Sequence, residues 1–112
     1  MATSSWFETR GVADAVIEVT FDSDRKGRFP KGFNPGGDWL ALPLKPKSST
    51  DELWDCRIVF DGLVPVPGET YRLDGFFLSP DTAPLSLPAG SGFTVFPGRV
   101  VGHGTIVEWL NR

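Results

Sequence analysis

Cys56 and His103 are the most reactive side chains of the sequence, and the 112 residues contain no other cysteine or histidine. A thiol activated by an imidazole could act as a nucleophile. Two soft ligands are too few for zinc, which takes three or four from a protein. Cys56 falls on the apolar side of an alternating stretch, where a free cysteine behaves as a small hydrophobic residue, and His103 is expected to point outward. A small enzyme using this pair is therefore our third hypothesis, behind two binding functions.

Other reactive patterns in the sequence are incomplete. The run that starts at Asp22 and Asp24 begins like a calcium loop, but its fifth position is Lys26 and its twelfth is Phe33, where calcium needs a bidentate glutamate. We interpret this run as a solvated turn. The sequence has no Gly-x-x-x-x-Gly-Lys segment for phosphates and no pair of carboxylates spaced for glycoside hydrolysis. We therefore expect a protein that is not an enzyme and that holds no metal, nucleotide or other cofactor.

One basic and aromatic cluster stands out in the first half of the chain: Arg25, Lys26, Arg28, Phe29, Lys31 and Phe33. Such a cluster could hold phosphates and stack a base, or it could bind an acidic protein surface. In the alternative interpretation, which we favour, Phe29 and Phe33 fold back into the core. The basic residues then form a solvated rim beside Asp22 and Asp24. The two interpretations differ in whether a ligand can reach the phenylalanine rings.

The composition predicts an all-β fold in one domain. The chain is long enough to bury a single core, and nine Phe and four Trp against one Met indicate a core of rigid aromatic and β-branched residues. Ten Pro and thirteen Gly fall between apolar runs, as in short strands joined by tight turns. We assign residues 13–112 to the domain. Residues 1–12 are expected to be an N-terminal extension, flexible or loosely docked through Trp6 and Phe7.

The lone cysteine cannot form an internal disulfide, which fits a reducing compartment. Residues 1–11 have no apolar signal-peptide core, and no apolar run reaches membrane-spanning length. We therefore expect a cytoplasmic protein without a membrane partner. The formal net charge of −3 argues weakly against a dedicated nucleic-acid binder, because phosphate contacts need a basic surface.

Six apolar runs are predicted to form the strands of a small antiparallel β-barrel. Their ranges are 13–22, 38–44, 53–60, 70–78, 93–96 and 100–109. Alternation in the first run directs every second residue to the core: Ala15, Ile17, Val19 and Phe21. In the third run, the same alternation places four apolar side chains on one face of the strand: Trp54, Cys56, Ile58 and Phe60. The stretch 79–92 is expected to contain a short strand or a single turn around Leu85 and Leu87.

The last predicted strand contains two glycines, Gly102 and Gly104, that would lie on the same side of it. Glycine in a strand interior marks a bulge, a barrel corner or a close approach of another backbone. We therefore expect this strand to bend sharply and to close the barrel against the first strand.

Three motifs follow one another along the chain. The first is Lys26-Gly27-Arg28 with the run Phe29-Pro30-Lys31-Gly32-Phe33-Asn34-Pro35, and the second is the turn Val66-Pro67-Gly68-Glu69. The third is Gly98-Arg99-Val100-Val101-Gly102-His103-Gly104. In this order and at these separations, they resemble the C-terminal β-barrel, the third domain, of translation elongation factor Tu. The likeness covers about residues 13–110 and implies that family's antiparallel barrel as a stand-alone domain.

The resemblance implies binding surfaces rather than chemistry, because the sequence contains no GTPase domain and no middle barrel. In the family, this barrel touches the T stem of aminoacyl-tRNA. Of the positions that match those contacts, Arg28, Arg99, Gly102 and Gly104 remain. A protein partner is therefore our first hypothesis, and a tRNA or another structured RNA in a translation-related role is the alternative. The candidate surface for either partner is Arg28, Phe29, Lys31, Phe33, Arg99, Gly102, His103 and Gly104.

Overall fold

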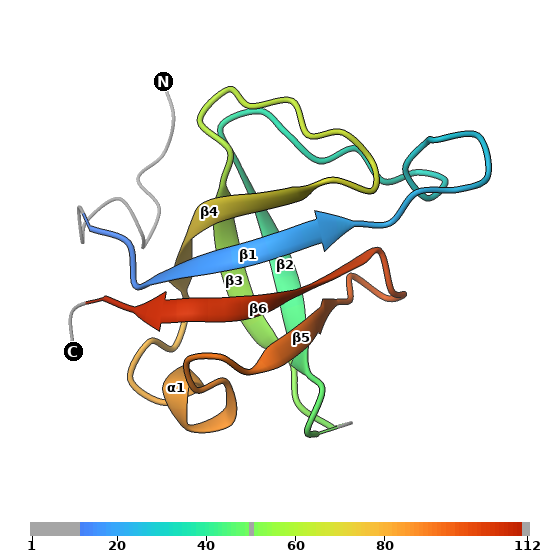
Figure 1. Ribbon diagram of the computed structural model, residues 1–112. Helices are drawn as coiled ribbons and strands as arrows, with labels where there is room; N and C mark the ends of the chain where they lie inside the picture. The colour runs from blue at the N-terminus through green and yellow to red at the C-terminus, as the bar shows by residue number, and fades with distance from the viewer. Residues whose placement is uncertain (1–11, 50, 111–112) are drawn as a thin grey trace.

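The computed structural model describes residues 12–49 and 51–110, which form a closed barrel of antiparallel strands (Figure 1). The strands are β1 (Ala15–Phe21), β2 (Trp39–Pro46), β3 (Trp54–Val59), β4 (Thr70–Phe77), β5 (Gly92–Val95) and β6 (Gly102–Trp109). They neighbour one another in the order β1-β4-β3-β2-β5-β6. The predicted all-β, six-stranded antiparallel barrel is therefore confirmed. The extension expected over residues 1–12, with Trp6 and Phe7, lies outside the described residues except for Val12.

β1 closes the barrel, because it pairs with β4 on one side and with the last strand, β6, on the other. Residues Ala15–Thr20 pair with β4, and Ala15–Phe21 pair with β6. Its alternate side chains are fully buried: Ala15, Ile17, Val19 and Phe21. Both the inward face predicted for this strand and the closure of the barrel by the last strand are confirmed.

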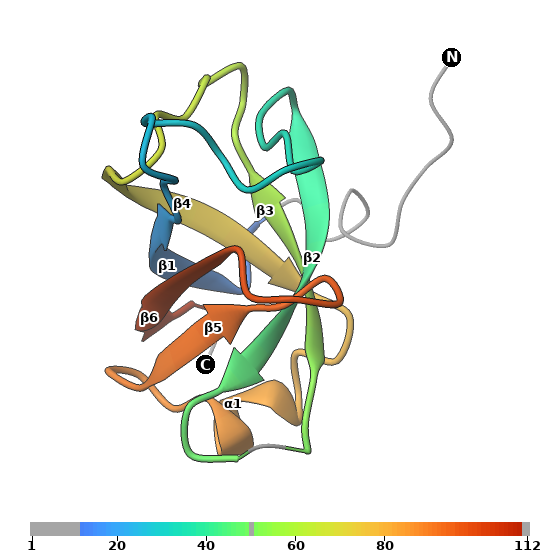
Figure 2. The ribbon, with the colours of Figure 1, turned by 90° about the vertical axis from the view of Figure 1, so that its right-hand side faces the viewer.

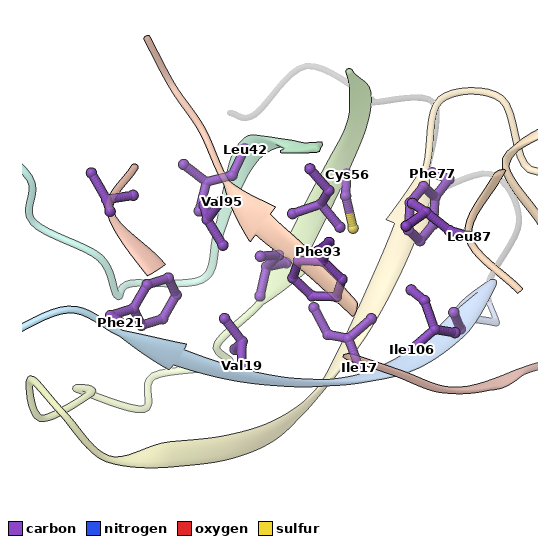
Figure 3. Packing of buried hydrophobic residues seen from close by; sticks show 14 of the residues in the cluster. Ile17, Val19, Phe21, Leu42, Cys56, Phe77, Leu87, Phe93, Val95 and Ile106 are labelled. Carbon is purple, nitrogen blue, oxygen red and sulfur yellow. The ribbon is translucent and has the colours of Figure 1, made fainter. Parts of the chain in front are cut away.

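The main core collects apolar side chains from all six strands. Figure 3 shows Phe93 from β5 and Phe77 from β4 entering the interior from different walls, with Cys56 of β3 also directed inward. Phe77, Phe93 and Cys56 are completely buried. Burial of a phenylalanine side chain contributes about 1.5–3 kcal/mol, so this cluster is a main source of the stability of the barrel.

Gly102 and Gly104 lie where β6 comes unusually close to the backbone of β1, the antiparallel strand that it pairs with. A Cβ atom on Gly102 would lie 2.7 Å from the carbonyl oxygen of Thr20. A Cβ on Gly104 would overlap the carbonyl oxygen of Glu18 and lie 2.8 Å from the ring of Phe93. Both glycines are therefore structural, and of the three explanations that the sequence left open the close backbone approach applies at them. The register shift in this strand pair falls further along, where Val16 and Ile17 pair with Glu108 and Ile106.

The connection between β4 and β5 contains one short helix, α1 (Ala83–Ser86). The sequence left a short strand or a single turn open here, and the structure has the single helical turn. The C-terminal end of the helix is held at Leu87, because the indole Nε1 of Trp109 donates a 2.8 Å hydrogen bond to the Leu87 carbonyl. Within the described ranges, no helix is long and apolar enough to cross a membrane.

Asp14 is the one charged residue in the described part of the chain that is buried. Its carboxylate accepts a 2.7 Å hydrogen bond from the backbone N–H of Phe77, at the end of β4. Its backbone carbonyl accepts a 2.7 Å bond from the N–H of Leu110, just after β6. Asp14 therefore ties the start of β1 to the ends of both neighbouring strands.

The connections after β1, β3 and β5 meet at one end of the barrel, and we call their residues 22–38, 60–69 and 96–101 the loop end. The N–H of Asp22 donates to the carbonyl of Val101 at 2.9 Å, and the N–H of Gly68 donates to that of Phe21 at 2.8 Å. These connections reach the right-hand side of Figure 1, which faces the viewer in Figure 2. The loop end therefore brings all three motifs of the sequence together.

Candidate functional site

An open hollow of about 720 Å³ lies at the loop end, beside the long connection between β1 and β2. Its wall is almost entirely that connection, with one residue from the connection between β3 and β4: Asp24, Gly27, Arg28, Phe29, Pro30, Lys31, Gly32, Phe33, Asn34 and Pro67. We call it the first hollow. It contains four of the eight residues that the sequence assigned to a partner surface.

Phe29 and Phe33 form the apolar floor of the first hollow and pack against the core. The ring of Phe33 is 5.5 Å from that of Phe21 and 6.1 Å from that of Phe29, measured between centroids. Phe33 is only 8% exposed and belongs to the main core, while Phe29 is half-buried against it. The two phenylalanines thus fold back onto the core, as the interpretation that we favoured predicts. A base could not insert against the covered faces of Phe33.

Asp24 holds the start of this connection in shape. Its Oδ1 accepts 2.8 Å hydrogen bonds from the backbone N–H groups of Lys26 and Arg28, and its Oδ2 accepts one of 3.1 Å from the Arg28 guanidinium. This is the Asx-type turn expected for the run that imitates a calcium loop. Among the described residues, no group of three or more His, Cys, Asp or Glu side chains is placed to hold a metal ion.

The turn at Asp24 is expected to loosen in acid. The backbone N–H of Arg28, with smaller contributions from Lys26 and the Arg28 side chain, lowers the pKa of Asp24 below its ordinary value of 3.8. A carboxylate whose pKa is lower in the folded state stabilises the fold above the unfolded-state pKa, and that contribution disappears as the pH falls through the folded-state pKa. Amide NMR shifts of Lys26 and Arg28 should therefore titrate with a midpoint below 3.8.

The control for this titration is Asp24→Asn, which keeps the side-chain shape and removes the ionisable group. In that variant, the acid transition of the Lys26 and Arg28 amides should vanish. A midpoint at or above 3.8 in the unmodified protein would contradict the hydrogen bonding described for Asp24.

Arg99 joins the turn between β5 and β6 to the first hollow, because its guanidinium donates a hydrogen bond to the backbone carbonyl of Lys31. The ammonium group of Lys31 has no hydrogen-bond or ion-pair partner in the part of the chain that the structure describes, and its side chain is exposed. Arg28 is also 68% exposed although it pairs with Asp24. The rim of the hollow therefore offers cationic groups to a partner.

A second hollow, of about 430 Å³, lies on the other side of Gly32, Phe33 and Asn34, which line both hollows. Its remaining wall comes from β2 and from the connection between β5 and β6: Leu40, Ala41, Leu42, Pro97, Arg99 and Val101. The two hollows together carry three basic side chains and one acidic side chain: Arg28, Lys31, Arg99 and Asp24. This local charge is opposite in sign to the formal net charge of −3 of the chain.

The other predicted surface residues lie outside the hollows. Gly102 and Gly104 belong to β6, and the backbone of the paired strand β1 occupies the space that their side chains would need, so no partner can approach them from the β1 side. His103 between them is exposed on the outside of the barrel, with its Nδ1 3.8 Å from the Asp22 carboxylate. The structure therefore brings Arg28, Phe29, Lys31, Phe33 and Arg99 together and leaves the β6 residues apart from them.

Cys56 and His103 are not brought together. Cys56 lies on β3 and is completely buried, whereas His103 lies on the outer surface of β6, and these two strands are not neighbours. Burial, reinforced by the charge of Asp14, raises the pKa of the Cys56 thiol far above its ordinary value. The thiolate that nucleophilic chemistry needs is therefore strongly disfavoured at this position.

Sequence reasoning missed several residues of the site. Pro67 reaches the first hollow from a distant turn, and Asn34 lines both hollows. The start of β2 was assigned only to a strand, although Leu40, Ala41 and Leu42 also line the second hollow. Pro67 and Asn34 carried a signal, because each lies in one of the three motifs that resemble the elongation factor barrel.

Comparisons with known proteins found no relative: no family model, no curated protein and no solved structure matches the chain. The barrel is established by its own strand pairing. The likeness to the third domain of elongation factor Tu continues to rest on the three motifs of the sequence.

Proposed function

We propose that this protein is a non-catalytic binding module that recognises another protein through the two hollows of the loop end. One observation carries the proposal: two open hollows flank residues 32–34, with apolar floors and with Arg28, Lys31 and Arg99 at their rims. Protein interfaces combine an apolar centre with a polar rim and are enriched in aromatic residues and arginine. A partner segment with apolar side chains and acidic groups would complement these hollows.

RNA binding remains the alternative, and the charge of the loop end favours a protein partner over it. The loop end as a whole contains five basic and five acidic residues, so it is neutral. Arg28 is paired with the Asp24 carboxylate, which leaves Lys31 and Arg99 as the cationic groups that the hollows offer to a partner. Phosphate recognition needs several free cationic groups at once. A base-stacking site would also need accessible rings, and Phe33 is buried.

We also propose that this barrel is related to the C-terminal barrel of elongation factor Tu, either by common descent or by convergence. In support, the first and third motifs lie side by side at the loop end, where Arg99 bonds the backbone of Lys31. The glycine pair of the third motif also has a physical role, because the backbone of β1 packs closely against β6 there. The translation-related role in the proposal rests on this motif likeness, which is an argument by analogy.

Capture from an extract of the native host tests the choice of partner. The unmodified protein, Lys31→Glu and Lys47→Glu are immobilised in parallel, and the bound material is read by both mass spectrometry and RNA sequencing. Lys47 is an exposed lysine outside the loop end, so it is a matched control for the change of charge. We expect a protein that binds the unmodified chain and Lys47→Glu and that is depleted at least about tenfold by Lys31→Glu.

The RNA readout makes this experiment decisive. Enrichment of a discrete RNA, lost with Lys31→Glu and quenched by moderate salt, would promote the RNA alternative to first place. A protein captured equally by all three forms would place the interface away from the hollows and contradict the proposal.

A further inference from the structure

The first half of β2 lacks a neighbouring strand on one of its sides. β2 pairs with β3 from Trp39 to Leu44, but it pairs with β5 only from Leu44 to Pro46. The last hydrogen bond on the β5 side runs from the N–H of Phe96 to the carbonyl of Pro43, at 2.9 Å. The barrel is therefore open beside the start of β2, although its strands form a complete ring.

Two residues explain why β5 leaves β2 at this point. Pro97 follows Phe96 and has no N–H to donate to β2. Gly98 then adopts a φ of 90°, a left-handed conformation that turns the chain away from the strand direction. Because this departure is built into the Pro-Gly turn, the open edge is a fixed feature of the barrel.

The alternation of β2 shows which backbone groups lie on the open edge. Asp38 directs its carbonyl to the β3 side, where it accepts from the N–H of Phe60, and Pro43 directs its carbonyl to the β5 side. Both backbone groups of a residue in an antiparallel strand point to the same side, and that side alternates along the strand. Ala41 therefore presents its N–H and C=O to the open side. No backbone hydrogen bond from the described residues reaches it there.

The second hollow lies at this edge. Leu40, Ala41 and Leu42 form its β2 wall, and the opposite wall includes Arg99 and Val101. Leu42 and Val101 are buried apolar residues, while Ala41 is exposed. An unpaired strand edge is a template for another extended chain, and here the edge adjoins an apolar hollow with a cationic rim.

We propose that an extended segment of the protein partner adds to the open edge of β2 and exchanges two main-chain hydrogen bonds with Ala41. This deepens the proposed function and rests on it. Added strands gain affinity from main-chain bonds and specificity from alternate side chains. The segment would place an apolar side chain in the second hollow and an acidic side chain near Arg99. Charge complementarity selects this occupant, because the charged groups that line the hollows are mostly basic.

The test uses a synthetic peptide of alternating valine and aspartate, blocked at both ends, and follows backbone amides of the whole chain by NMR. We expect shifts at Ala41 and slower hydrogen exchange of its amide when the peptide is bound. The same peptide with an N-methyl group on its central residue loses one hydrogen bond and should bind at least about fivefold more weakly, since one bond contributes about 1 kcal/mol. A peptide with lysine in place of aspartate should not bind.

Ala41→Pro is the matching change in the protein. The substitution removes the N–H group that residue 41 presents to the open edge, and it leaves the hydrogen bonds between β2 and β3 intact. Proline is tolerated on open strand edges. We expect binding of the valine–aspartate peptide to weaken at least about fivefold, while Ala41→Thr, which keeps the N–H, retains it. If Ala41→Pro fails to fold, the N-methyl peptide still decides the question on the unmodified protein.

Two results would overturn the inference in distinguishable ways. If the peptide shifts only amides around Arg28 and Phe29, and N-methylation has no effect, the loop end binds acidic peptides but the β2 edge takes no strand. If no amide of the loop end responds to the peptide, and host-protein capture is also insensitive to Lys31→Glu, the proposed function fails with it. Concentration-dependent dimers with protected Ala41 would instead assign the edge to a second copy of the chain and would contradict the partner proposed.

Discussion

Gly104→Val is expected to destabilise the protein by about 3 kcal/mol or more, the largest effect of any single substitution considered for the wall of the barrel. The Cβ atom would overlap the Glu18 carbonyl oxygen on β1 and lie 2.8 Å from the Phe93 ring. The first of these neighbours is backbone held in the ladder, so it cannot move aside without separating β6 from β1. Gly102→Val is expected to be less severe, because its nearest neighbour, the Thr20 carbonyl oxygen, lies at 2.7 Å.

The measurement is the urea midpoint of each variant, with Gly92→Ala as the control. Gly92 is also a strand glycine, but a Cβ there would meet mainly the side chain of Lys47, which is flexible and exposed. Gly92→Ala should therefore change stability by less than about 1 kcal/mol. Equal midpoints for Gly104→Val and Gly92→Ala would contradict the close packing of the β1 backbone against Gly104.

Phe33→Ala is expected to cost about 3 kcal/mol of stability and also to abolish partner binding. Truncation of a buried phenylalanine typically costs 3–5 kcal/mol, and the lower end applies here because Phe33 lies in a connection that can partly collapse. Its ring contacts Phe21 in the core and Phe29 at the surface, and it lines both hollows. Removing it takes away the apolar floor that the two hollows share.

Phe29→Ala is the companion variant, because Phe29 is only half-buried and lines the first hollow alone. It should cost clearly less stability than Phe33→Ala. Thermal unfolding of both variants, with capture of the host partner measured below the transition, separates the two roles. If Phe33→Ala is as stable as the unmodified protein, Phe33 is a surface residue, and the ligand-stacking interpretation of the cluster becomes the better one.

Much of the fold could be inferred from the sequence, because alternation and turn residues are local signals. Ala15, Ile17, Val19 and Phe21 alternate with polar residues and therefore identify the inner face of β1. Gly102 and Gly104 predicted a bulge, a barrel corner or a close backbone approach, and only the packing of β1 against β6 decides among the three. The bounds of β2 were less predictable. It continues to Pro46 because pairing with β5 holds Leu44–Pro46 in the sheet, and no local pattern shows that.

The site was only partly predictable, because it depends on which loops meet. Arg28, Phe29, Lys31 and Phe33 are close in sequence and all line the first hollow, whereas Arg25 and Lys26 of the same cluster line neither hollow. Arg99 was added through the family resemblance. Its contact with the Lys31 carbonyl joins segments that are far apart along the chain. Ala41 carried no signal at all, since an alanine in a strand acquires meaning only when the neighbouring strand turns away from it.

Site-specific photo-crosslinking in the native host tests the central claim, that the loop end is a protein-binding surface. A photoreactive phenylalanine analogue replaces Asn34, which is exposed and lines both hollows, and in a second form replaces Thr105, which is exposed on the outer face of β6. We predict a discrete protein crosslink from position 34 that survives nuclease treatment, and none from position 105. A crosslink to RNA from position 34, or a protein crosslink from position 105 without one from position 34, would contradict the account.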